Sequence, residues 1–143
     1  MKKLIISSAL LLGLALSTQA QCDKKLTLNG SKAIFYGADG NEENTKESSI
    51  VIEITKTTIF INPGDGENDK VSGTIKDLVC EWKEPLKNGK SSSSKVEFTD
   101  PNGNLKTGKI TVEAKDGAIT FWLELDEWTG RKIKVPVEKV KEE

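Results

Sequence analysis

The sequence predicts an all-β protein, an antiparallel up-and-down meander of about eight strands that forms a closed or nearly closed β-barrel. Apolar residues recur at every second position in short runs, and turns rich in Gly, Asn, Asp and Pro separate these runs. No convincing amphipathic helix lies between them. Strands that are neighbours in sequence usually pair, which favours a meander. A barrel has no exposed sheet edges, and a β-sandwich is the alternative.

The first strands are predicted at 26–28 and 33–36, where the alternation is least regular. A clearer pattern begins at residue 50, where isoleucines share one face of two consecutive strands. These residues are Ile50, Ile52, Ile54, Ile59 and Ile61. Successive side chains of a strand point to opposite faces, so the isoleucines predict a buried face. Their β-branched shape also suits strands.

The second half of the chain contains six further runs that predict strands. They cover residues 71–75, 78–82, 95–99, 110–114, 119–125 and 133–137. Asp116-Gly117 can adopt the positive φ angles of a type I′ turn, so we expect a tight hairpin there. Pro136 lacks an N–H donor, which predicts an edge or the end of a register.

Two polar segments, 38–49 and 85–95, interrupt the pattern. The first holds a single apolar residue, and the second contains four consecutive serines, which are typical of a flexible connector. We therefore expect both to be loops. They are either plain solvated connections or a partner surface at the mouth of the barrel.

Residues 1–20 have the pattern of a secretory signal peptide. Lys2 and Lys3 precede an apolar run at 4–16, and small residues lead to a cleavage site after Ala20. The run is shorter than the roughly 20 apolar residues of a spanning helix. We expect an exported protein, periplasmic or extracellular, whose residues 21–143 form one domain without stable membrane insertion.

Removal of the leader, with Lys2 and Lys3, lowers the basic count from 21 to 19 against 22 acidic side chains, a net charge of −3. The charges are interspersed, so we expect no nucleic-acid partner. A lipid anchor on Cys22 is also not expected, because a lipoprotein signal has Gly or Ala where this chain has Gln21.

Two cysteines remain after cleavage, Cys22 and Cys80. An even number of cysteines in an exported chain favours a disulfide. By closing a loop, this bridge would stabilise the folded state by about 4 kcal/mol in the chain-entropy model. The alternatives are two unpaired thiols, a metal pair or a redox dithiol. The spacing matches neither CxxC nor a zinc pattern, so the structural disulfide is the prediction.

The chain contains no histidine, the commonest general base and transition-metal ligand. It also lacks the GxSxG, P-loop and Rossmann patterns. The acidic turn at 65–69 alternates oxygen-bearing residues as calcium loops do, but it departs from EF-hand spacing and suits an ordinary turn. We therefore expect no catalysis, no cofactor and no metal.

The three tryptophans divide by face. Trp82 shares a face with Leu78 and Cys80, which places it in the core. Trp122 lies on the opposite face from Phe121, and Trp128 follows in a turn. An outward Trp122 beside Trp128 indicates either a contact for a sugar or protein, or a ring covered by the N-terminal arm.

The pattern resembles the small lipocalin-like proteins that Gram-negative bacteria export. The resemblance lies in IVIEITKTTIFIN at 50–62, SGTI at 72–75, CEW at 80–82 and KDGAITFWLEL at 115–125. It implies a barrel with an apolar interior and a small hydrophobic ligand.

The prediction is a non-catalytic protein that binds a small apolar ligand inside the barrel. The inward residues expected to line that interior are Ile52, Ile54, Ile61, Trp82, Phe98, Phe121 and Leu123. The alternatives are a filled barrel that binds or inhibits another protein through its outer face and loops, and a structural envelope protein. A cavity open to solvent favours the ligand; a filled core favours the protein partner.

Overall fold

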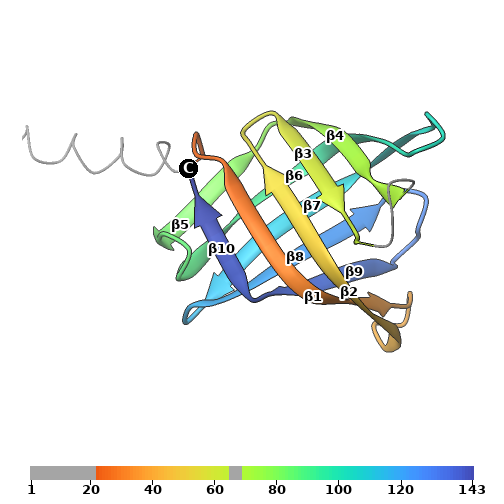
Figure 1. Cartoon of the computed structure of the whole chain (residues 1–143), viewed down its shortest axis with the longest axis horizontal. Coiled ribbons are helices and arrows are strands. Elements are labelled where there is room, and N and C mark those ends of the chain that lie inside the picture. Colours follow the sequence, from red (N-terminus) through yellow and green to blue (C-terminus); the bar gives the residue numbers. More distant parts are fainter. Residues whose placement is uncertain (1–21, 65–68) are drawn as a thin grey trace, which may run out of the picture.

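A computed structural model describes residues 22–64 and 69–143 of the chain (Figure 1). These residues form an all-β fold with ten strands and no α-helix. The strands are β1 (Leu26–Tyr36), β2 (Glu42–Ile54), β3 (Thr58–Asn62), β4 (Val71–Lys76), β5 (Val79–Glu84), β6 (Asn88–Thr99), β7 (Leu105–Lys115), β8 (Ala118–Leu125), β9 (Lys132–Val137) and β10 (Lys139–Glu142).

Eight of the strands form a closed antiparallel up-and-down barrel. The order around it is β1-β2-β3-β4-β6-β7-β8-β9, and β9 returns to pair with β1. Closure rests on three register pairs between β1 and β9, from Ile34 opposite Lys134 to Tyr36 opposite Lys132. The predicted barrel is therefore confirmed over the sandwich, and the arrangement is consistent with a lipocalin-like architecture.

The two additional strands lie together at one end of the barrel, which we call the split end (left in Figure 1). β5 follows β4 after a bend at Asp77, whose φ is 55°, and pairs with β6. β10 follows β9 after Glu138 and pairs with the first residues of β1. The opposite end, which we call the open end, carries the tip of the β1–β2 hairpin and the β8–β9 connection.

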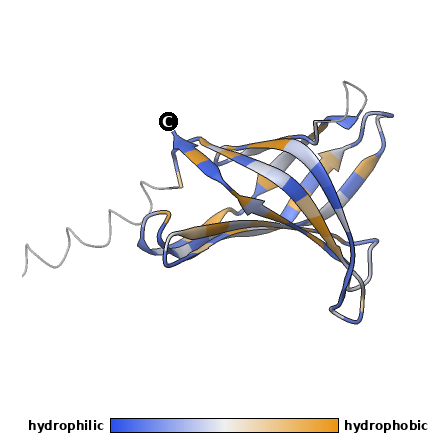
Figure 2. Cartoon of the chain, turned by 60° about the horizontal axis from the view of Figure 1, so that its bottom comes forward, coloured by the Kyte–Doolittle hydropathy of each residue, from blue (hydrophilic) through white to orange (hydrophobic). Residues whose placement is uncertain are grey.

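Alternation along the strands builds a single core inside the barrel, and Figure 2 shows hydrophobic and hydrophilic stretches along the strands. The core residues are Leu26, Leu28, Ile50, Ile52, Ile54, Ile59, Ile75, Trp82, Val96, Phe98, Ile110, Val112, Ala114, Ile119, Phe121 and Val135. Trp82 is among them, as its face predicts. Burying each large apolar side chain contributes about 1.5–3 kcal/mol.

The disulfide between Cys22 and Cys80 is present, with the two Cα atoms 5.9 Å apart. Cys22 precedes β1 and Cys80 lies in β5, so the bridge ties the start of the barrel to its split end. The Lys56 ammonium holds the same N-terminal segment through the Asp23 carboxylate, 3.0 Å away. The predicted pairing is confirmed.

The predicted hairpin turn at Asp116-Gly117 joins β7 to β8. The φ angles are 51° at Asp116 and 84° at Gly117, and a type I′ turn requires both to be positive. The Asp116 backbone N–H donates to Oδ1 of Asn88 at 3.1 Å, which ties this turn to the start of β6. This local prediction is confirmed.

β1 passes close to β9 at Gly30, where the β1–β2 register shifts. A Cβ atom at Gly30 would lie 2.6 Å from Cγ1 of Val135 and 2.8 Å from the carbonyl oxygen of Pro136. Only glycine fits this approach. Pro136 lies beyond the last residue pair of the β1–β9 ladder, so this ladder does not need the N–H that proline lacks.

The prediction of two loops is wrong for most of both segments. Residues 42–49 belong to β2, and residues 88–95 belong to β6. The first part of β2 is exposed, but its backbone pairs with β1 in a hairpin that needs no buried face. Backbone hydrogen bonds to an ordered neighbour therefore form a strand where side-chain pattern does not indicate one.

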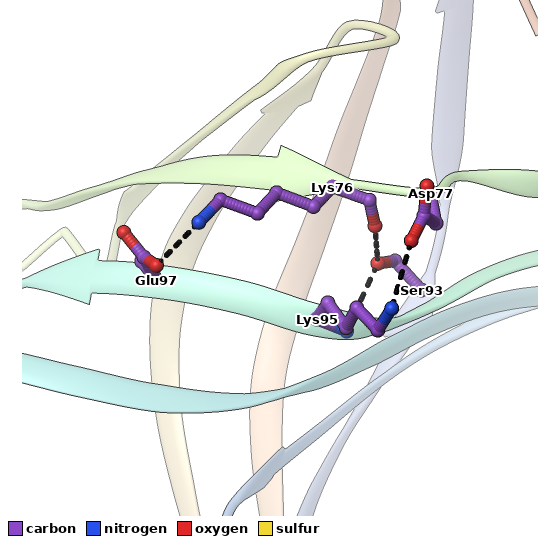
Figure 3. Close-up of polar contacts among 5 residues, drawn as sticks. All are labelled: Lys76, Asp77, Ser93, Lys95 and Glu97. Carbon is purple, nitrogen blue, oxygen red and sulfur yellow. Dashed lines mark hydrogen bonds and ion pairs between the residues drawn. The ribbon is translucent and has the colours of Figure 1, made fainter.

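Ser93 shows what the serine run does (Figure 3). It is 3% exposed and lies where β6 passes from pairing with β5 to pairing with β4. Its hydroxyl donates to the carbonyl oxygen of Lys76 and accepts the backbone N–H of Lys95 at 3.2 Å. Ion pairs Lys76–Glu97 (2.6 Å) and Lys95–Asp77 (3.1 Å) flank this junction. The serine satisfies backbone groups that the change of partner leaves unpaired.

Ser93→Ala is expected to lower the free energy of unfolding by about 1–3 kcal/mol, because two backbone groups lose a buried partner. Ser94→Ala is the matched control, since Ser94 is exposed and should change stability by no more than about 0.5 kcal/mol. Urea denaturation of both variants measures the difference. Equal stability of the two variants would contradict this role for Ser93.

Two sequence predictions lie outside the described residues. They are the signal peptide at 1–20 and most of the acidic turn at 65–69. Within the described ranges, no helix has the length and apolar character needed to cross a bilayer.

Candidate functional site: an apolar cavity and an aromatic outer face

A cavity of about 160 Å³ lies inside the barrel towards the open end. Five strands, β1, β2, β3, β8 and β9, contribute to its walls. The described lining residues are Ala33, Phe35, Lys46, Ser48, Ile50, Ile52, Ile61, Pro63, Phe121, Leu123, Ile133 and Val135. Phe35, Leu123 and Ile133 are only half-buried, so the cavity reaches the surface.

Four of the seven residues that the sequence predicts as lining stand in this wall: Ile52, Ile61, Phe121 and Leu123. The other three are buried elsewhere in the core and are not among the described lining residues. Ile54 pairs with Leu26 near the split end, and Trp82 lies in β5 at that end. Phe98 packs against Gly73. A Cβ atom added at Gly73 would lie 3.1 Å from Cδ1 of the Phe98 ring. Large side chains thus fill these parts of the barrel.

Sequence reasoning missed several lining residues for different reasons. Ile50, Ile133 and Val135 were available from the alternation, and only the tertiary structure places them at the open end. Ala33 and Phe35 follow the register shift after Gly30. Even-numbered residues of β1 point inward before this shift, and odd-numbered residues point inward after it. Nothing in the polar segment 38–49 signals that Lys46 and Ser48 contribute to the lining.

The polar part of the lining comes from β2, at Lys46 and Ser48. The Ser48 hydroxyl donates to the carbonyl oxygen of Pro63, which joins β2 to the end of β3. Lys46 is exposed and marks the mouth. The site therefore has an apolar interior and a polar entrance on one side.

The hairpin tip beside this entrance is closed by Asp39. Its carboxylate accepts the backbone N–H of Asn41 at 3.0 Å and the side-chain amide at 3.2 Å. These two hydrogen bonds, the backbone one foremost, favour the ionised form and lower the pKa of Asp39 below its ordinary value of 3.8. The ionised carboxylate thus helps to close the turn.

Size limits what the cavity can hold. Drug-sized ligands occupy sites of roughly 300–1,000 Å³. An engineered cavity of about 150 Å³, lined by Leu, Ile and Phe, takes benzene in another protein. The cavity here, at about 160 Å³, matches the second case. It fits one aromatic ring or a short branched alkyl group.

A second feature lies on the outer face of the barrel, around Trp122 of β8. The Tyr36 ring lies 5.7 Å from it between centroids, and the Lys132 and Lys134 ammonium groups lie 4.7 and 5.5 Å from the Trp122 ring centroid. The indole N–H donates to Oε1 of Glu113 at 3.1 Å. Trp122 therefore faces outward and packs against β1 and β9 side chains.

A cleft of about 200 Å³ adjoins this cluster at the open end. Tyr36 and Lys132 line it from the Trp122 side, and Trp128 and Arg131 line it from the β8–β9 connection. Phe35, Glu43 and Ile133 complete the described lining. The two features share residues and form one continuous surface.

No family model, curated protein or solved structure matches the chain. Among residues 22–64 and 69–143, no three His, Cys, Asp or Glu side chains gather as a metal site would require. The functional inference therefore rests on the cavity and the outer surface.

Proposed function

We propose that this chain is an exported, non-catalytic binding protein that takes a small apolar ligand in the cavity at the open end. The observation that carries the proposal is the cavity itself, which side chains leave unfilled inside an otherwise packed barrel. Closely packed interiors rarely hold voids larger than a water molecule, because an unfilled void costs stability. A cavity of this size that reaches the surface and has largely apolar walls supports a ligand-binding role.

The lining defines the chemistry of the ligand. The apolar walls favour a ring or a branched alkyl group, which gains about 25 cal/mol per Å² of apolar surface removed from water. The polar lining residues Lys46 and Ser48 lie at the entrance, so a polar part of the ligand fits only there. A larger lipid-like molecule would place one end in the cavity and the remainder outside.

Further support for this proposal comes from architecture and compartment. A closed eight-stranded up-and-down barrel is the arrangement in which lipocalin-like proteins hold small ligands, and an interior of this kind accommodates one of them. The Cys22–Cys80 bridge is compatible with an oxidising compartment outside the cytoplasm. The absence of histidine from the whole sequence supports a binding role over catalysis.

Benzene and toluene are the probes that test this site. Calorimetric titration is expected to show saturable binding to the wild type. Ala33→Leu adds three heavy atoms to the cavity wall and should abolish or strongly weaken that binding. Ala118→Leu, the matched control at an exposed position of β8, should bind as the wild type does.

Two outcomes would count against the proposal. The first is an absence of binding by the wild type for both probes and for a fluorescent lipid analogue. The second is binding that Ala33→Leu leaves unchanged, which would place the ligand elsewhere on the protein. Thermal unfolding of each variant confirms that it is folded.

A further inference from the structure

One part of the surface collects the residue types that dominate protein–protein interfaces. The chain has three tryptophans, one tyrosine and one arginine. Two of those tryptophans, the tyrosine and the arginine lie together with two lysines on the outside of β1, β8 and β9 and the adjoining connection. We call this surface the aromatic–cationic face: Tyr36, Trp122, Trp128, Arg131, Lys132 and Lys134.

The contacts within this face hold its side chains in place. Tyr36 contacts the Trp122 ring and also lines the neighbouring cleft, and Lys132 does both as well. The indole N–H of Trp122 is fixed by its hydrogen bond to Glu113. Lys132 and Lys134 are half-buried, so their stems cover aromatic surface while their charges remain near it. Such side chains lose little further entropy when a partner binds.

The cations of this face are available for ion pairs with a partner. Nine ion pairs link lysines to carboxylates elsewhere in the described residues, whereas Arg131, Lys132 and Lys134 enter none there. Lys132 and Lys134 lie in β9, and Arg131 directly precedes this strand in the β8–β9 connection. Carboxylates arranged along an opposing surface would be complementary to them.

We propose that the aromatic–cationic face binds a protein partner. The partner would place carboxylates opposite Arg131, Lys132 and Lys134 and insert one aromatic or aliphatic side chain between Tyr36 and Trp128. Trp, Tyr and Arg are the residues most enriched among interface hot spots. A cleft of about 200 Å³ accepts a single such side chain. The cleft shares Phe35 and Ile133 with the lining of the cavity inside the barrel, but this role does not require a ligand in that cavity.

Two other classes of partner fit the face less well. An anionic membrane surface carries charge continuously, and the carboxylates of Glu43 and Glu113 beside the cations would repel it. An acidic polysaccharide could satisfy the cations but has no apolar side chain for the cleft. A folded or extended polypeptide can combine both elements and keep its carboxylates away from Glu43 and Glu113.

A random copolymer of glutamate and tyrosine, labelled with fluorescein, is the probe for this surface. We expect saturable binding by fluorescence polarisation, and none to a lysine–tyrosine copolymer. Trp128→Ala, and separately Lys132→Gln with Lys134→Gln, should each weaken binding by at least about tenfold, as loss of a hot spot does. Lys83→Gln with Lys139→Gln is the matched control. It removes two exposed lysines of β5 and β10 at the split end, and affinity should stay within about twofold.

The proposal is overturned if the copolymer does not bind, or if the control pair weakens binding as much as the lysine pair on the face. It is also overturned if polygalacturonate or phosphatidylglycerol vesicles bind more tightly than the copolymer. Unchanged thermal unfolding midpoints verify that each variant is folded. Binding of toluene in the cavity should be unaffected by all of these variants, which separates failure here from failure of the cavity proposal.

Discussion

Phe121→Ala is expected to lower the free energy of unfolding by about 3–5 kcal/mol, the range for removing a buried aromatic ring. Phe121 is 1% exposed and points inward from β8. Its register partners are Val112 of β7 and Val135 of β9, and both are buried as well. The substitution also merges the lost ring volume with the existing cavity, so the neighbouring strands cannot easily close the space.

Glu124→Ala provides the comparison on the same strand. Glu124 lies on the opposite face of β8 from Phe121, and its loss should change stability by no more than about 0.5 kcal/mol. Urea denaturation of the two variants measures both free energies. If Glu124→Ala proved the more damaging, the assignment of inward and outward faces in β8 would be wrong by one residue. A second consequence is specific to the cavity: Phe121→Ala should accept apolar probes larger than toluene.

Removal of the disulfide is expected to have an effect of similar size. Cys22 and Cys80 are 58 residues apart in sequence, and a loop of that length corresponds to about 4 kcal/mol in the chain-entropy model. The variant with Cys22→Ser and Cys80→Ser should therefore unfold at a lower urea concentration. Its split end should exchange amide hydrogens faster than its open end, because the bridge joins the segment before β1 to β5.

Two measurements check this prediction independently. Thiol labelling of the denatured, unreduced wild type should detect no free cysteine. Reduction of the wild type should then reproduce the stability of the double serine variant, which excludes an effect of the serine side chains. Two labelled thiols per chain would show that the bridge does not form in the protein as purified.

Much of the fold was available from the sequence because period-two patterning and turn chemistry are local properties. The isoleucines from Ile50 to Ile61 and the Asp116-Gly117 turn identify strands and a hairpin without reference to any distant residue. The cysteine count likewise predicts the Cys22–Cys80 pairing, since only one pairing is possible. The prediction failed at two segments that do not bury an apolar face. Residues 42–49 form a strand by pairing with β1, and residues 88–95 form a strand by pairing with β5 and β7.

The candidate site was predictable only in part. Alternation identifies which side chains point inward, and Ile52, Ile61, Phe121 and Leu123 do line the cavity. Alternation carries no information on how far along the barrel a residue lies. It therefore could not separate these four from Ile54, Trp82 and Phe98, which lie in filled parts of the core. Whether Ala33 and Phe35 point inward depends on the register shift after Gly30, where β1 passes close to β9.

By itself, the sequence determined the all-β class, most of the strands, the inward and outward faces and the disulfide, because each depends on local pattern or on residue counts. Tertiary structure alone decided which end of the barrel is filled, where the cavity lies and which aromatic and basic residues meet on the outer face. Closure brings β1 against β9, and through it Tyr36 against Trp122 and the lysines of β9. These residues are far apart in sequence, and their association is set by barrel closure and register rather than by any local preference.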